Sequence, residues 1–239
     1  MVIASSTVAP AFAAEISSRL AERGLAMIDA PVSGGAAGAA AGKLIILGSG
    51  PQHAYDACQD LFEGYAAQAY RFGDEAALGS KVKLINNLLC GVHIAVASEA
   101  MALAKREGIN LPLLYGVITH SAGNSWAFQD RMPHVIADSL TPITALNIFV
   151  KDLGLVLDMA HSVDFTAPLT ECAQCAILTE CVLTEDLGAS SLKIRLSAIK
   201  KECGPCGGNR QLIDCVAFEK GITPPVEKRR IAESTRRSH

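Results

Sequence analysis

The sequence predicts an α/β segment over residues 1–78, an all-α segment over residues 79–189, and a divergent basic tail over residues 190–239. Over the first seventy residues, short β-like runs alternate with helical stretches, which is the pattern of βαβ units and a mainly parallel sheet. After Gly79 the pattern becomes helical, with no proline in residues 80–107. The composition agrees, because 50% of the 239 residues are apolar and 5% are aromatic, and small, unbranched side chains favour helix packing.

The α/β segment contains four expected strands and two expected helices. Pro10 opens the first helix and Gly24 closes it, since proline is preferred in the first turn of a helix and glycine just beyond the last. The strands are expected at residues 1–4, 25–28, 43–47 and 67–72, and the helices at residues 10–23 and 51–62.

The all-α segment begins with a long helix from Ser80 to Glu107, which Gly108 ends. Further helices are expected at about residues 112–121, 124–136 and 145–161.

The charge distribution argues against nucleic acid or a membrane as the main partner. The net charge is −3, although residues 190–239 hold eleven basic and five acidic side chains. A basic tail leaves nucleic-acid contact open, against a tail of different origin. The start of the chain lacks the basic region of a signal peptide, and the longest apolar run, Leu88 to Ala97, is too short to span a bilayer. We expect a soluble, cytoplasmic protein.

Six of the eight cysteines lie in the last third of the chain. They include two CxxC pairs, Cys172/Cys175 and Cys203/Cys206, and four thiolates can hold a tetrahedral zinc ion. The pairs are further apart than in a zinc ribbon, and the first lies in helix-like sequence. We therefore expect no metal site and reduced thiols, with zinc as the open alternative.

The strongest functional signal is the run DAPVSGG at residues 29–35. A strand that ends in proline and then Ser33, Gly34 and Gly35 exposes backbone N–H groups at the carboxyl edge of a sheet, where open α/β sheets bind ligands. Such an array suits a carboxylate, because glycine lets a ligand approach the main chain closely. An ordinary glycine turn is the alternative interpretation.

Two lysines are the other candidates. Lys83 and Asn87 are four residues apart near the start of the long helix and therefore share one face. Burial beside an apolar face and the positive end of the helix would both lower the pKa of Lys83 toward a range useful for proton transfer; a solvated surface lysine is the alternative. Lys151 lies in the apolar run FVKDLGL, where a charge needs a partner. Pairing with Asp152 is expected to be poor, because adjacent residues on a helix do not face each other. A distant anion or a cofactor is the alternative partner.

Together these motifs resemble the β-hydroxyacid dehydrogenases, the family that includes 3-hydroxyisobutyrate dehydrogenase. DAPVSGG is similar to the family's substrate-binding signature, KLINN at residues 83–87 to its catalytic helix, and FVKDLGL at residues 149–155 to its cofactor-facing segment. The longer runs at residues 79–104 and 122–132 look most like the L-threonate dehydrogenase branch. The resemblance covers residues 1–170.

The resemblance implies the C-terminal part of a Rossmann-like nucleotide-binding domain, joined by the long helix to a helical domain like that of 6-phosphogluconate dehydrogenase. Lys83 would take the proton from the hydroxyl of a small hydroxy acid as hydride leaves for NAD, with NADP as the alternative cofactor. The substrate contacts would be Ser33, Gly34, Gly35 and Asn87, and the cofactor contacts Thr7 and Lys151. The helical domain would form a homo-oligomer.

The sequence departs from this family in three respects. It contains no GxGxxG turn to hold a pyrophosphate, so we expect an N-terminally truncated member. Ala77 replaces the glycine usual before the catalytic helix, and similarity fades from about Cys172. Two function classes follow: an oxidoreductase acting on L-threonate or a similar sugar acid, or an inactive remnant that serves as a binding or oligomerisation module.

Overall fold

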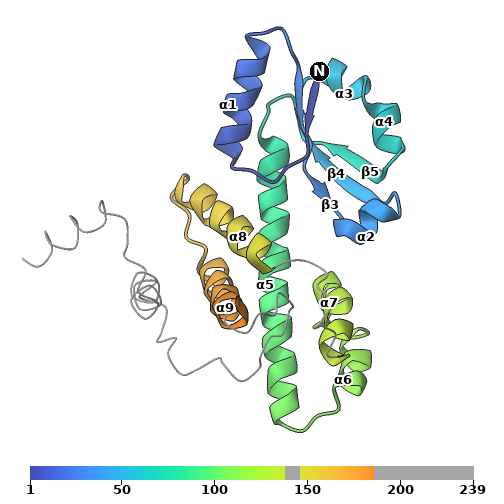
Figure 1. Ribbon diagram of the computed structural model, residues 1–239, viewed down its shortest axis with the longest axis vertical. Coiled ribbons are helices and arrows are strands. Elements are labelled where there is room, and N and C mark those ends of the chain that lie inside the picture. The colour runs from blue at the N-terminus through green and yellow to red at the C-terminus, as the bar shows by residue number, and fades with distance from the viewer. Residues whose placement is uncertain (138–145, 186–239) are drawn as a thin grey trace, which may run out of the picture. The chain divides into compact units, whose positions relative to one another are not determined.

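The computed structural model describes residues 1–137 and 146–185, and an α/β part precedes a helical part, as predicted (Figure 1). The strands are β1 (Val2–Ala4), β2 (Met27–Asp29), β3 (Val32–Ser33), β4 (Leu44–Gly48) and β5 (Ala66–Arg71). The helices are α1 (Pro10–Ala21), α2 (Gly35–Ala40), α3 (Gln52–Asp56), α4 (Gln59–Glu63), α5 (Leu78–Arg106), α6 (Leu111–Ile118), α7 (Trp126–Ile136), α8 (Leu146–His161) and α9 (Pro168–Glu185). The predicted tail, residues 190–239, lies outside the described residues.

The strands form two small sheets that are mainly parallel. β1 pairs with β2 in parallel, with Val2 opposite Met27, and β4 pairs with β5 in parallel. β3 lies antiparallel to β4 at the edge of a sheet with the order β3-β4-β5. A single antiparallel bridge between Asp29 and Ser49 joins the two sheets at the end of β2, so these two residues connect all the strands.

Two elements of this part were not predicted, and one was predicted wrongly. β3 has two residues and α2 is built of glycine and alanine, so neither shows an apolar period. The single helix expected at residues 51–62 is two short helices, α3 and α4, separated at Ala57 and Cys58. Ala54, Cys58 and Phe62 all enter the core with Ile28 and Ile46. These three side chains follow one another at a spacing of four residues and face the same core on both sides of the break.

Helix α5 links the two parts and forms the centre of the helical part. Its start contacts β2 and β4, and its length contacts α7, α8 and α9 (Figure 1). By length and composition alone α5 also resembles a membrane span, although the core helix of a soluble protein passes the same test. Its buried residues instead line a core with Ala127, Phe149 and Leu153.

Small residues on α5 allow its neighbours to pack closely. A Cβ added at Gly91 would lie 2.8 Å from Leu153 Cδ2, so glycine is what lets α8 approach α5. The helices predicted at 112–121, 124–136 and 145–161 are confirmed as α6, α7 and α8, while α9 was not predicted. Helix α9 carries Cys172 and Cys175, and the second CxxC pair lies outside the described residues.

Candidate active site

Lys83 lies in the second turn of α5, on the side of the helix that faces the protein interior. Burial lowers the pKa of its ammonium group, and the neighbouring Lys151 lowers it further, while Asp152 and Cys90 oppose this by raising it. Desolvation is the largest of these effects, because an ammonium group loses hydration when it is buried. The amine of Lys83 is therefore easier to deprotonate than that of a surface lysine, as the sequence predicted.

Asn87, one turn after Lys83, is held by a buried carboxylate from another helix. Its Nδ2 donates to Asp152 Oδ2 at 2.8 Å, and the two residues are 5% and 4% exposed. Asp152 also acts electrostatically on Lys83. The structure thus brings Lys83, Asn87 and Asp152 together where α5 packs against α8.

Sequence reasoning missed Asp152, although its position carried a signal. Phe149, Leu153 and Val156 form the buried stripe of α8, and Asp152 falls on the same stripe at helical spacing. A carboxylate on an apolar stripe is expected to have a partner. The periodicity of α8 would have separated the buried Asp152 from the more exposed Lys151.

Lys151 joins the two segments that were predicted to contact the cofactor. Its Nζ donates to the Thr7 carbonyl oxygen at 3.0 Å, although 144 residues separate them in the chain. The same ammonium lies 2.9 Å from Asp152 Oδ1, so the expectation of a poor Lys151–Asp152 pair was wrong. The long, flexible lysine stem lets the ammonium reach back to its neighbour despite the helical geometry.

The contact between Lys151 and Asp152 is electrostatic. Asp152 Oδ1 is buried and accepts no hydrogen bond within the described residues, although Lys151 Nζ is near. The short distance is a Coulomb contact whose alignment is too poor for a hydrogen bond. The Asp152 carboxylate is thus held at Oδ2 by the Asn87 amide and at Oδ1 by the charge of Lys151.

The predicted carboxylate-binding segment has a different local structure from the one expected. Strand β2 ends at Asp29, before Pro31, and a separate strand, β3, follows in the other sheet with Ser33 opposite Ile45. Gly34 and Gly35 then have φ angles of 123° and 62°, which only glycine adopts without strain. A Cβ at Gly34 would also lie 3.2 Å from Leu44 Cδ2, so this turn requires glycine.

The Ser33 hydroxyl forms no hydrogen bond with another described residue, and α2 begins two residues later, at Gly35. The first N–H groups of a helix have no acceptor within the helix. This segment therefore has main-chain donors and a hydroxyl close together, its role as a carboxylate site stays a prediction, and no contact joins it to Lys83 or Asn87 among the described residues.

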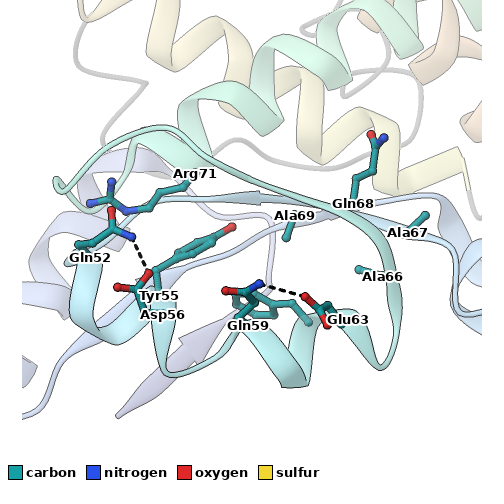
Figure 2. A pocket seen from close by; sticks show the side chains of 11 residues that line it. Gln52, Tyr55, Asp56, Gln59, Glu63, Ala66, Ala67, Gln68, Ala69 and Arg71 are labelled. Atoms are coloured by element: carbon teal, nitrogen blue, oxygen red, sulfur yellow. Dashed lines mark hydrogen bonds between the residues drawn. The ribbon is translucent and has the colours of Figure 1, made fainter.

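A separate pocket of about 530 Å³ lies between α3, α4 and β5 (Figure 2). Its acidic residues Asp56 and Glu63 accept hydrogen bonds from Gln52 and Gln59 of the same helices. None of the predicted site residues lines it. No group of three metal-ligating side chains occurs in the part of the chain that the structure describes.

Two family models match the chain along most of its length. Residues 1–73 match the NAD binding domain of 6-phosphogluconate dehydrogenase, and residues 77–191 match the NAD-binding domain of NADP-dependent 3-hydroxyisobutyrate dehydrogenase. The second match extends about twenty residues beyond the point where the resemblance was expected to end. The chain belongs to the 3-hydroxyisobutyrate dehydrogenase-like family, a class of oxidoreductases that use NAD(P).

Individual relatives agree. The L-threonate dehydrogenase of Cupriavidus necator is 55% identical over 173 residues, which are 72% of this chain and 58% of that protein. A solved 3-hydroxyisobutyrate dehydrogenase from Salmonella typhimurium is 45% identical with a TM-score of 0.72, over 78% of this chain and 64% of that one. The protein Psf3, solved with NADP+, is 26% identical with a TM-score of 0.70, over 80% and 66%. The chain thus spans less than two thirds of the length of these relatives.

Proposed function

We propose that this chain carries the proton-transfer and substrate-binding part of an NAD(P)-dependent dehydrogenase that oxidises a small hydroxy acid, L-threonate or a similar sugar acid. The observation that carries the proposal is the group formed by the half-buried Lys83 and the buried Asn87 and Asp152. A lysine with a lowered pKa beside a fixed amide and a carboxylate is the arrangement that proton transfer from a hydroxyl needs. The identity to L-threonate dehydrogenases supports the choice of substrate.

In the proposed reaction, the neutral amine of Lys83 accepts the proton of the substrate hydroxyl. When bound, NAD(P)+ would supply the acceptor for the hydride that leaves the carbon bearing this hydroxyl. Asn87 orients the substrate through the part of its amide that Asp152 does not use. Asp152 then stabilises the ammonium that forms on Lys83, since opposite charges attract strongly in a buried site.

The other predicted contacts are assigned by resemblance. Ser33, Gly34 and Gly35 would hold the substrate carboxylate, because the turn offers a hydroxyl and main-chain donors. Thr7 and Lys151 would contact the cofactor. Their hydrogen bond supports this assignment, since it places a cation and a hydroxyl-bearing residue together beside Asp152.

The fit to a dinucleotide is partial. Lys151 and Thr7 suit a polar, anionic group close to Lys83, but the sequence contains no GxGxxG turn for a pyrophosphate. The second function class is a catalytically inactive binding or oligomerisation module. The exposed apolar residues Ile85, Leu89, Val96 and Leu103 on α5 favour it, because such a stripe suits contact with a second copy in the cytoplasm.

Calorimetric titration of the purified chain with NADH and NADPH, with and without L-threonate, separates the two. The dehydrogenase would be supported by saturable nucleotide binding together with turnover that depends on L-threonate. Lys83→Ala should abolish this turnover. Lys81→Ala should retain it, because Lys81 is the exposed lysine on the same turn. A folded chain that binds neither nucleotide, yet forms dimers in sedimentation, would overturn the enzyme and support the module.

A further inference from the structure

Two polar residues at the ends of neighbouring strands hold the start of α5. Asp29 Oδ2 accepts the main-chain N–H of Ser80 at 2.8 Å, and Asp29 Oδ1 accepts the Ser80 hydroxyl at 2.9 Å. Ser49 Oγ accepts the N–H of Gly79 at 3.0 Å. Asp29 and Ser49 are also bonded to each other through both main-chain N–H groups, at 2.9 and 2.8 Å. The junction of the two sheets is thus the attachment point of the helix.

The carboxylate of Asp29 is 1% exposed, and its burial has a physical compensation. The first N–H groups of a helix lack acceptors within the helix, and the positive end of the helix stabilises a nearby anion. Burial raises the pKa of Asp29, while the two Ser80 hydrogen bonds lower it. A buried carboxylate with both oxygens committed to one residue makes a rigid contact.

The main chain of α5 packs tightly against the strands around this contact. A Cβ added at Gly79 would lie 2.4 Å from the Leu47 carbonyl oxygen and 2.6 Å from that of Asp29. Both are main-chain atoms of the strands, so the helix rests directly on the backbone of β2 and β4. The position of the first turn of α5 is therefore set by the sheet.

Lys83 lies between this attachment and a second one. Ser80, Lys83 and Asn87 follow one another at helical spacing on the inner side of α5, and Asn87 is held by Asp152. Both ends of this two-turn stretch are fixed by buried carboxylates, one from the sheet and one from α8. The stretch that carries Lys83 has little freedom to rotate or slide.

We propose that Asp29 and Ser80 form a clamp that positions Lys83, so that Asp29 is a positioning residue for proton transfer. The proposal rests on the proposed function of Lys83 and deepens it. The groups that act electrostatically on Lys83 are Asp152, Cys90 and Lys151, and Asp29 is not among them. Asp29 therefore acts through the placement of α5, and releasing the clamp lets water reach the Lys83 ammonium.

The test measures the titration of Lys83 itself, without cofactor or substrate. Trace labelling with acetic anhydride over a pH series, read by mass spectrometry, reports the pKa of each lysine in the folded chain. We expect Ser80→Ala and Asp29→Asn to raise the pKa of Lys83 by about one unit, which is roughly a tenfold loss of neutral amine below that pKa.

Two controls isolate the effect. Ser98→Ala removes another buried hydroxyl of α5, one that donates to Ile94 within the helix, and should leave Lys83 unchanged. Lys105, in the last turn of α5, should label equally in every variant. Circular dichroism and urea unfolding confirm that each variant is folded; if Asp29→Asn does not fold, Ser80→Ala decides, because it keeps the main-chain bond to Asp29.

An unchanged Lys83 titration in folded Ser80→Ala would overturn the clamp. The pKa of Lys83 could instead rise as expected in the variants while the wild-type chain shows no turnover of L-threonate. That result would support the clamp and refute the proposed function. The two failures are therefore distinguishable.

Discussion

The Asn87 amide and the Asp152 carboxylate form a buried hydrogen bond of 2.8 Å between α5 and α8. Lys83 lies one helical turn before Asn87 and feels the Asp152 charge. One contact therefore serves the packing of two helices and the electrostatics of the proposed proton-transfer site. Stability and lysine titration should consequently change together when either residue is altered.

Asp152→Ala should lower the free energy of unfolding by about 1–3 kcal/mol, because it leaves the buried Asn87 amide without its acceptor. It should also lower the pKa of Lys83 further, since Asp152 raises it. Urea unfolding and lysine labelling measure the two effects. Asp158→Ala on the exposed side of α8 is the control, and an equal loss of stability there would contradict the assignment.

Lys83→Met should increase the free energy of unfolding at neutral pH. The folded-state pKa of Lys83 lies below its ordinary value, so between the two values the unfolded chain binds more protons than the folded one. Wild-type stability then rises with pH across this window, and the cost of burying the charged form is present only at lower pH.

The gain from Lys83→Met over the wild type should accordingly be largest near pH 7 and disappear at about pH 11, above the ordinary lysine range. Urea unfolding at both pH values measures it. Lys81→Met, at an exposed position on the same helix, is the matched control for the loss of a lysine. A gain that persists at the higher pH would instead indicate an apolar packing effect.

Gly79→Ala should destabilise the chain by more than about 3 kcal/mol, because the added methyl meets two main-chain carbonyl oxygens that cannot move aside. Gly116→Ala is the matched control. Gly116 lies exposed within α6, and a Cβ there meets nothing within 4 Å. Alanine should stabilise that helix by roughly 0.5–1 kcal/mol. Thermal unfolding of both variants gives the comparison, and similar shifts would refute the close approach of α5 to the sheet.

Lys151→Met should weaken NADPH binding while leaving the free energy of unfolding almost unchanged. The side chain is 54% exposed, so its loss should change the free energy of unfolding by less than about 1 kcal/mol. If Lys151 contacts the cofactor, the same variant should bind NADPH at least tenfold more weakly by calorimetry. Lys105→Met, remote in sequence on α5, should bind as the wild type does. Equal affinity in both variants would remove Lys151 from the cofactor site.

Local sequence signals were sufficient wherever an element carried its own start, stop and period. Pro10 and Gly24 delimited α1, and the proline-free run that ends at Gly108 predicted α5. Such signals did not reveal β3 or the break between α3 and α4. β3 exists because β4 pairs with it, and α3 and α4 contribute Ala54, Cys58 and Phe62 to one core from both sides of the break.

The amino-acid sequence by itself predicted the succession of an α/β part and a helical part, the family resemblance and the residues of the proposed site: Lys83, Asn87, Ser33 with its two glycines, Thr7 and Lys151. The tertiary structure alone decided which of these meet. The bonds from Asp29 to Ser80, from Asn87 to Asp152 and from Lys151 to Thr7 each join residues more than fifty positions apart. Helical and strand periods describe neighbours within one element, whereas these contacts depend on how separate elements pack, and so no local pattern encodes them.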